Sequence, residues 1–177
     1  MRTINAPPLL LEPLSVRHAP EMFAVLSDPA IYEFENEPPA SEEALSRRYA
    51  VLERRHSHDG TQTWLNWVIR LPSGELAGYV QATVLGSGSA YVAYELASRY
   101  WRQGIASTAV AAMMSELHAN HGVGPCVAVL KARNFRSLAL LRKLGFQAGS
   151  RAQVLESGAK PDELVMVEPA TATPNAS

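Results

Sequence analysis

The chain has 177 residues, 47% of them hydrophobic and 19% charged, and a formal net charge of −1. These values are typical of one globular domain, and no apolar run approaches the ~20 residues of a membrane-spanning helix, so we expect no membrane partner. The single cysteine, Cys126, excludes an intrachain disulfide and a metal site built from several cysteines. Because the N-terminus also lacks a signal-peptide pattern, we expect a cytoplasmic protein. We also expect no metal.

The N-terminal part predicts one strand and two helices. Leu9–Leu14 is a plausible strand, and His18–Asp28 predicts a helix with a proline in its first turn. Ser41 predicts the cap of a second helix, which runs from Glu42 to about His56. Between the helices, Ile31–Ala40 is acidic, aromatic and interrupted by prolines, so it cannot form a regular helix.

The middle of the chain predicts an antiparallel meander. Short connections that contain glycine separate three strand-like runs, which favours hairpins over crossovers. The three predicted strands are Trp64–Leu71, Leu76–Leu85 and Ala90–Leu96.

The pattern then changes to a helix at Ile105–Asn120, a strand at Pro125–Ala132 and a helix from Phe135 to about Leu144. A last hairpin is predicted from Gln153–Glu156 and Glu163–Val167. Strands followed by alternating helix and strand predict an α+β protein with a mixed sheet. We expect one domain over residues 1–168. Residues 169–177 are small and polar with two prolines, and predict a disordered tail.

Basic residues are concentrated in one stretch of the chain. From Arg99 to Arg151 there are eight of them and a single acid, Glu116, whereas the rest of the chain is acidic. Such a stretch suggests an anionic ligand, although pairing with acids from the other half would also account for it. Nucleic acid is a poorer fit because the whole chain is slightly acidic, so we expect no nucleic-acid partner.

The first segment with chemical meaning joins a strand to a helix. Glu95 ends the strand, a turn carrying Gly104 follows, and small residues such as Ala106 open the helix. The first backbone N–H groups of a helix lack internal partners and lie at the positive end of its dipole, so they bind phosphate oxygens. Arg99 and Arg102 could add charge-assisted hydrogen bonds. A purely structural turn would explain the same spacing.

The second segment is Lys131–Phe146. Asn134 can cap the helix that follows it, and Gly145 can take the left-handed position that ends this helix. Phe146 then lies where its side chain can pack back against Leu141. Each of these residues therefore has a reason in the folding of the helix alone.

Together the two segments resemble the GNAT acetyltransferase family. The run from Tyr100 to Ala109 is similar to the family's pyrophosphate loop, usually Gln/Arg-x-x-Gly-x-Gly/Ala, and Gly104 and Ala106 match its last two fixed positions. Asn134, Ser137 and the run Lys143–Phe146 resemble the segment after the family's fifth strand. Trp101 stands where Gln or Arg is usual, which resembles the branch that acetylates ribosomal-protein N-termini.

The resemblance implies an α/β/α sandwich. Its mixed, mostly antiparallel sheet would splay between the fourth and fifth strands and be flanked by helices. Acetyl-CoA would be the acetyl donor, with its pantetheine arm lying in the splay. The residues implied to bind it are Leu96, Ala97, Ser98, Arg99, Arg102, Gln103, Gly104, Ile105, Ala106, Ser107, Asn134 and Ser137.

The catalytic residues are less well defined by the resemblance. Many family members carry a tyrosine seven residues after the asparagine, and this chain has Leu141 there. Ser137 is therefore our candidate proton donor to the departing thiolate. Glu95 is our candidate general base, acting directly or through a water, although pointing to solvent beside Arg99 is the structural alternative.

On the acceptor side we expect a primary amine, either a protein N-terminus or a small molecule. Phe34 belongs to an acidic and aromatic loop suited to a cationic amine, and Trp64 and Tyr79 are candidates to line the acceptor cleft, with core packing as their alternative role. A non-catalytic acyl-CoA-binding or regulatory domain is the alternative function, motivated by Leu141. The protein would be a monomer or a homodimer.

Overall fold

The computed structural model of the protein describes residues 1–169. Its strands form one sheet in the order β1-β2-β3-β4-β5-β6-β8-β7. Neighbouring strands are antiparallel except β5 and β6, which are parallel. The strands are β1 (Ile4–Ala6), β2 (Leu9–Pro13), β3 (Gln62–Arg70), β4 (Leu76–Leu85), β5 (Ala90–Leu96), β6 (Cys126–Lys131), β7 (Gln147–Ala148) and β8 (Glu163–Val167).

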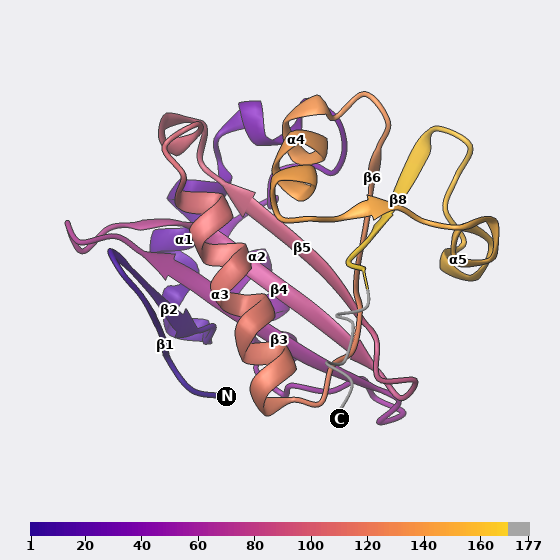
Figure 1. The fold of residues 1–177 in the computed structure, drawn as a ribbon. Helices are drawn as coiled ribbons and strands as arrows, with labels where there is room; N and C mark the ends of the chain where they lie inside the picture. The colour runs from indigo at the N-terminus through magenta and orange to yellow at the C-terminus, as the bar shows by residue number, and fades with distance from the viewer. Residues whose placement is uncertain (170–177) are drawn as a thin grey trace.

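Helices cover both faces of this sheet. In Figure 1, α3 crosses one face and α1 and α2 lie behind the other, while α4 stands at the open end between β5 and β6. Each face therefore has its own hydrophobic core, one centred on α3 and the other on α1 and α2. The helices are α1 (Ala19–Leu26), α2 (Glu42–Leu52), α3 (Ile105–Asn120), α4 (Phe135–Lys143) and α5 (Arg151–Ser157), with 3-10 turns η1 (Val16–His18), η2 (Pro29–Tyr32) and η3 (Ser98–Tyr100).

The predicted fold class is confirmed: a mixed, mostly antiparallel sheet lies between helices. The predicted bounds of β4, β5 and α3 agree with the structure. Ser41 caps α2, as predicted, by accepting a hydrogen bond from Ala44 N–H. Asn134 caps α4 in the same way, and Gly145 follows it with a φ of 89°.

Two predictions about secondary structure were wrong. Gln153–Glu156 is not a strand but part of α5, which a capping box between Ser150 and Gln153 opens and the left-handed Gly158 closes. Glu163–Val167 is a strand, as predicted, but it pairs with β6 and β7. The second predicted helix also ends earlier than His56, because α2 stops at Leu52 and Arg55 turns the chain with a φ of 69°.

The sheet splays between β5 and β6, as predicted. The two strands are in register only at Ala90↔Cys126 and Tyr91↔Val127, beyond which they separate. They are the fourth and fifth strands when β1 and β2 are counted as the one predicted N-terminal strand. Backbone groups alternate in direction along a strand. Since Ala97 N–H bonds Ala77 O toward β4, the backbone groups of Leu96 point the other way, toward the gap, where Leu96 O accepts a hydrogen bond from Trp101 Nε1 at 2.7 Å.

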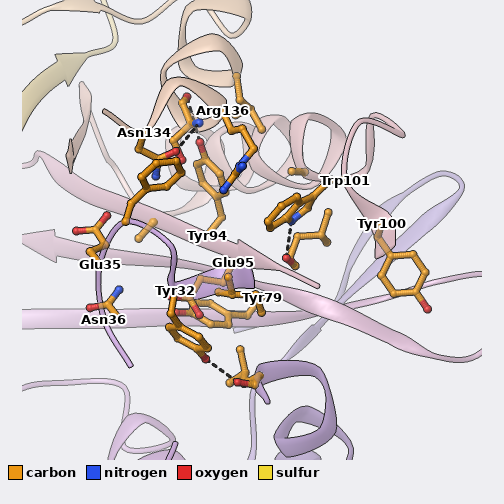
Figure 2. Close-up of a pocket in the computed structure, with 18 of the residues that line it drawn as sticks. Tyr32, Glu35, Asn36, Tyr79, Tyr94, Glu95, Tyr100, Trp101, Asn134 and Arg136 are labelled. Carbon is orange, nitrogen blue, oxygen red and sulfur yellow. Dashed lines mark hydrogen bonds between the residues drawn. The ribbon is translucent and has the colours of Figure 1, made fainter. Parts of the chain in front are cut away.

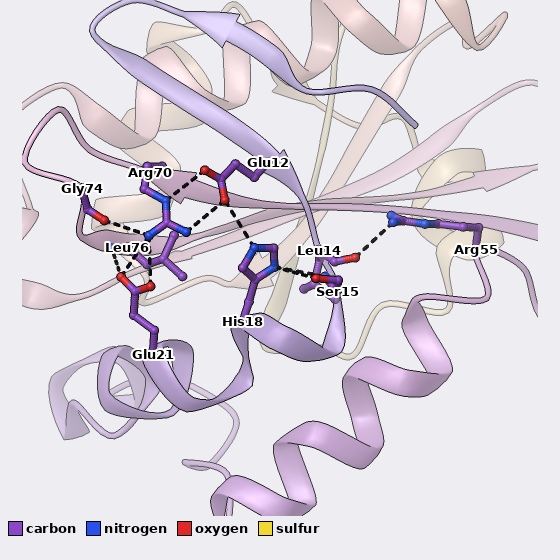
Figure 3. Close-up of polar contacts among 9 residues, drawn as sticks. All are labelled: Glu12, Leu14, Ser15, His18, Glu21, Arg55, Arg70, Gly74 and Leu76. Carbon is purple, nitrogen blue, oxygen red and sulfur yellow. Dashed lines mark hydrogen bonds and ion pairs between the residues drawn. The ribbon is translucent and has the colours of Figure 1, made fainter.

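A buried polar network fastens α1 to the sheet (Figure 3). His18 is 5% exposed; its Nδ1 accepts a hydrogen bond from Ser15 N–H, and its Nε2 lies 3.3 Å from Glu12 Oε2. Arg70 bridges Glu12 and Glu21, with nitrogen–oxygen distances of 3.0 Å to each. The network thereby satisfies a buried imidazole that belongs to no catalytic group.

Within residues 1–169, no helix is long and apolar enough to cross a lipid bilayer. The predicted extent of the domain, 1–168, stays a prediction. Of the predicted disordered tail, residues 170–177 lie outside the described residues.

Candidate active site

A cavity of about 850 Å³ opens where β5 and β6 separate. Its walls come from four places far apart in the sequence: the segment from η2 to α2, the strands β4 and β5, the start of α3, and α4. Figure 2 shows Tyr32, Tyr79 and Glu95 grouped on one side, while Asn134, Arg136 and Trp101 lie on another. The cavity thus reaches from the α1–α2 face of the sheet to the ends of α3 and α4.

The N-terminus of α3 forms one end of the cavity. Gly104 has a φ of 79°, and a Cβ there would meet no atom within 4 Å, so the backbone conformation rather than crowding favours glycine. The first helical hydrogen bond runs from Thr108 N–H to Gly104 O. The backbone N–H groups before Thr108 therefore have no carbonyl partner within the helix. No side chain caps this end and no acid lies in the first turn, so the dipole and the amides are offered to an anion.

The start of α4 lies across the gap from α3. Asn134 Oδ1 accepts a hydrogen bond from Ser137 N–H (3.1 Å), so the amide group of Asn134 is held at the cavity wall. The Tyr94 hydroxyl donates to Ser137 O at 3.4 Å. Burial raises the pKa of Tyr94 to about 12, so this phenol stays protonated at neutral pH.

Glu95 supplies a half-buried carboxyl to the opposite wall. It faces Tyr79 in the β4–β5 register, so the two side chains lie on the same face of the sheet. Burial raises the pKa of Glu95, and Tyr79, the Arg48 charge and Asn36 oppose this shift. The pKa of Glu35 is also raised, chiefly by burial. These two carboxyls make this side of the cavity acidic. Because their pKa values are raised, they also bind protons more readily than exposed carboxyls do.

Arg136 connects the two sides of the cavity. Its guanidinium carbon lies 4.3 Å from the centre of the Trp101 ring and 4.8 Å from that of Phe34. The same group forms an ion pair with Glu33. Phe34 also meets Phe135 edge to face, with ring centres 6.0 Å apart. Through these contacts, α4 holds both the loop before α2 and the turn before α3.

The fold and this cavity can be compared with known proteins. A model of the acetyltransferase (GNAT) domain matches residues 8–147, more than half of the chain. The chain belongs to this family. The predicted family is thereby confirmed, and with it the class of enzyme, an acyltransferase. No curated protein sequence matches the chain significantly.

Solved acetyltransferase structures share the fold. RimL, a ribosomal L7/L12 α-N-protein acetyltransferase in complex with coenzyme A, is 19% identical with a TM-score of 0.79, over 94% of this chain and 97% of that one. The ribosomal-protein-S5-alanine acetyltransferase of Vibrio fischeri is 18% identical with a TM-score of 0.74, over 94% and 95%. MccE, a microcin C7 self-immunity acetyltransferase in complex with acetyl-CoA and AMP, is 16% identical with a TM-score of 0.74, over 90% and 91%.

Most of the predicted site residues lie on the cavity wall. The structure brings together Glu95, Leu96, Arg102, Gly104, Ile105, Ala106, Ser107, Asn134, Ser137, Phe34 and Tyr79.

Five predicted site residues do not line the cavity. Ala97 N–H bonds Ala77 O at 2.9 Å, and Ser98 N–H bonds Asp28 Oδ2 at 2.7 Å, so both amides already have partners. Arg99 stacks on Tyr100, and Gln103 donates to Arg99 O. Trp64 lies on β3 and donates to Gln62 Oε1. Their expected contacts with acetyl-CoA or the acceptor have no support in this GNAT structure.

Sequence reasoning missed several wall residues. Tyr32, Asn36, Arg48 and Arg136 line the cavity, and none of them belongs to a motif of the family that the sequence displays. Arg136 occupies an x position of the Asn-x-x-Ser run, which the motif does not specify. In the sequence, Arg48 resembles a solvent-exposed residue of α2. Only the acidic and aromatic composition of the loop before α2 pointed toward Tyr32 and Asn36.

Proposed function

We propose that the protein transfers the acetyl group of acetyl-CoA directly to a primary amine, with Glu95 as the general base. The observation that carries this proposal is the position of Glu95. Its half-buried carboxyl lines the same cavity as the uncapped N-terminus of α3, so a candidate base and a candidate anion-binding site face the same cavity. A protein that only bound acyl-CoA would need the second feature alone.

The donor end fits the diphosphate and pantetheine arm of acetyl-CoA. Amides at the start of α3 would bind the pyrophosphate, and the gap-facing N–H of Leu96 would face the pantetheine, since Leu96 O already accepts from Trp101 Nε1. Arg102 and Lys143 line the cavity, and neither forms an ion pair within residues 1–169. Arg102 and Lys143 therefore supply positive charge at the donor end. Lys131, by contrast, is already paired with Asp162 and Glu163.

Glu95 would accept a proton from the ammonium group of the acceptor, directly or through a water, and so free the amine that attacks the thioester. Because burial raises its pKa above the ordinary 4.5, the carboxylate is a stronger base than an exposed one. The acetyl thioester supplies the electrophile, and no covalent enzyme intermediate is required. Positioned proton transfer of this kind contributes about 10²–10⁴-fold to rate.

Ser137 is the proposed proton donor to the leaving sulfur. It lines the cavity at the start of α4, whereas Leu141, at the position of the family's tyrosine, is 1% exposed and belongs to the core. The leucine therefore packs the helix against the sheet. Tyr94, hydrogen-bonded to Ser137 O, holds this part of α4 in place and presents a second protonated hydroxyl.

The acceptor is proposed to be a cationic amine. Glu35, Glu95, Tyr32 and Tyr79 give that side of the cavity negative charge and hydroxyl groups suited to an ammonium ion. A protein N-terminus is supported by the fold shared with the two ribosomal-protein acetyltransferases, and a small molecule by the fold shared with MccE, which was solved with AMP beside acetyl-CoA. Both classes of acceptor belong in the test.

The test is release of free CoA thiol from acetyl-CoA with a panel of amines, and a mass-spectrometric search for the acetylated product. The panel holds N-terminal peptides of ribosomal proteins L7/L12 and S5, polyamines, aminoglycosides and amino acids, with each N-acetylated compound as its blocked control. Thiol release that needs a free amine supports the proposal. Tight acetyl-CoA binding without turnover on any amine would instead support the non-catalytic binding domain.

A further inference from the structure

Three potential metal ligands meet at the end of the molecule away from the cavity. His118, Cys126 and Glu168 each offer a ligand atom, and these atoms all lie within 4.8 Å of one another. His118 Nε2 is 3.1 Å from Glu168 Oε2 and 3.9 Å from Cys126 Sγ. None of the three lines the cavity. They come from α3, the start of β6 and the residue after β8.

The backbone holds these three residues in place. Cys126 begins β6 beside Ala90 of β5, where the two parallel strands are still paired. Glu168 N–H bonds Cys126 O at 2.8 Å, and Cys126 N–H in turn bonds Glu168 Oε2 at 3.2 Å. His118 lies in the last turn of α3, whose buried face packs on the sheet. Two of the three donor atoms are thus mounted on α3 and β6, and the third follows β8 and is held to Cys126 by two hydrogen bonds.

Two of the three donor–donor distances are close to those of a tetrahedral zinc site, and the sulfur–oxygen pair lies within 4.8 Å. Zinc bonds of about 2.3 Å to sulfur and about 2.0–2.2 Å to nitrogen and oxygen place tetrahedral ligands about 3.3–3.6 Å apart. The nitrogen–oxygen and nitrogen–sulfur distances here lie on either side of that range. Side-chain adjustments of a few tenths of an ångström would bring these two pairs into it. His118 is 35% exposed, which gives an ion a path from solvent.

We propose that His118, Cys126 and Glu168 form a binding site for Zn²⁺, with a water in the fourth position. A thiolate and an imidazole favour a borderline-soft cation over Mg²⁺ or Ca²⁺. The thiolate and the carboxylate together balance the two positive charges of the ion. One S–H bond breaks, its proton leaves to solvent, and a bond from sulfur to zinc forms.

The buried sulfur of Cys126 lies 3.9 Å from His118 Nε2, beside the Glu168 carboxylate. Zn²⁺ would bind the thiolate form of Cys126, so its affinity should rise with pH and its binding should release a proton. The ion would fasten α3 to β6 and to the end of β8.

The test uses full-length protein treated with a chelator, freed of it, and titrated with Co²⁺ as a spectroscopic stand-in for Zn²⁺. One equivalent should produce a thiolate-to-cobalt charge-transfer band in the near ultraviolet, which one equivalent of Zn²⁺ then removes. Added Zn²⁺ should also raise the midpoint of thermal unfolding. Failure of the wild-type protein to develop this band under saturating Co²⁺ would overturn the proposal.

Matched variants make the result specific. Cys126→Ala should abolish the charge-transfer band, and His118→Gln, at an exposed position, should weaken binding at least about tenfold, since even second-shell changes cost that much. His121→Gln removes a neighbouring histidine that pairs with Glu116 instead, and should leave binding intact. If Cys126→Ala fails to fold, His118→Gln and Glu168→Gln carry the test. Equal binding by His118→Gln and His121→Gln would refute the site.

Discussion

At their first residues β5 and β6 are paired neighbours, and further along they separate, so that the last residues of β5 line a cavity of about 850 Å³. At the paired end, Cys126, Glu168 and His118 contact one another through backbone and side-chain bonds. At the open end, the Leu96 N–H faces a gap, and Glu95 and Glu35 carry raised pKa values. The same two strands therefore provide a fixed frame at one end and exposed bonding groups at the other.

The comparison shows how a sheet can present a site without extra domains. Strands that stay paired satisfy their own backbone groups, and strands that separate leave those groups for a ligand. The helices follow the same division, because the last turn of α3 lies at the paired end and its uncapped first turn lies at the open end. Substitutions at the open end should change function, and those elsewhere should change stability.

The largest expected effect is at Gly104. Gly104→Trp should weaken acetyl-CoA binding by more than about 100-fold, because an indole would cover the amides that bind phosphate. Gly104→Ala is the matched control. It bears the same strain of a φ of 79°, and its Cβ meets no atom within 4 Å. Calorimetric titration with acetyl-CoA checks both variants, and equal affinities for the two would remove Gly104 from the site.

A smaller effect is expected at Arg136, which joins the two sides of the open end. Arg136→Lys keeps the charge but loses the planar stacking on Trp101 and Phe34. Losing stacking worth about 1–2 kcal/mol should raise a KM by about tenfold. Initial rates over both substrates measure this. Arg142→Lys, an exposed change on the same helix, is the control, and matching KM values for the two variants would contradict the bridging role.

The smallest effect concerns stability and pH in the network that holds α1. Burial lowers the pKa of His18 below its ordinary 6.5, so the unfolded chain binds this proton more readily and stability falls as pH drops through that value. Glu12, whose pKa Arg70 lowers, adds stability above 4.5 that is lost at still lower pH. His18→Gln should flatten the first of these declines in urea unfolding curves. An unchanged slope between neutral and mildly acidic pH would contradict this assignment.

Sequence patterns predicted the elements whose signals are local. The β4 and β5 runs alternate between short glycine turns, and α3 follows a left-handed glycine, so their bounds agreed with the structure. The error at α5 had a local signal too, the Ser150–Gln153 capping box, but the segment was taken for half of a hairpin. β1 has three residues ahead of two prolines, too few for a strand pattern to emerge.

The site was predictable only where one segment carries it. Gly104 and Asn134 stand in motifs with regular spacing, whereas Arg48 and Tyr32 reach the cavity through the packing of α1 and α2. The cluster at the paired end shows the same limit. His118 and Cys126 are close in the chain, but the strand order brings Glu168 beside them from 42 residues further on. No local pattern records that neighbourhood.

The open end acts as a catalytic site only if Glu95 takes part in the chemistry. Glu95→Gln keeps the shape of the side chain and removes the base, so kcat should fall by about 100-fold or more while the acetyl-CoA Kd stays the same. Its fold should be as stable as that of the wild type near neutral pH, because the raised pKa means that burying the ionised carboxylate costs free energy there.

The most direct measurement is therefore the pH profile of kcat/KM for the wild type and Glu95→Gln, with the best amine of the panel as acceptor. We predict that the wild-type rate falls on acidification, with an apparent pKa above 4.5, and that the variant loses this limb together with most of its rate. A variant with wild-type kcat and the same acid limb would contradict the account.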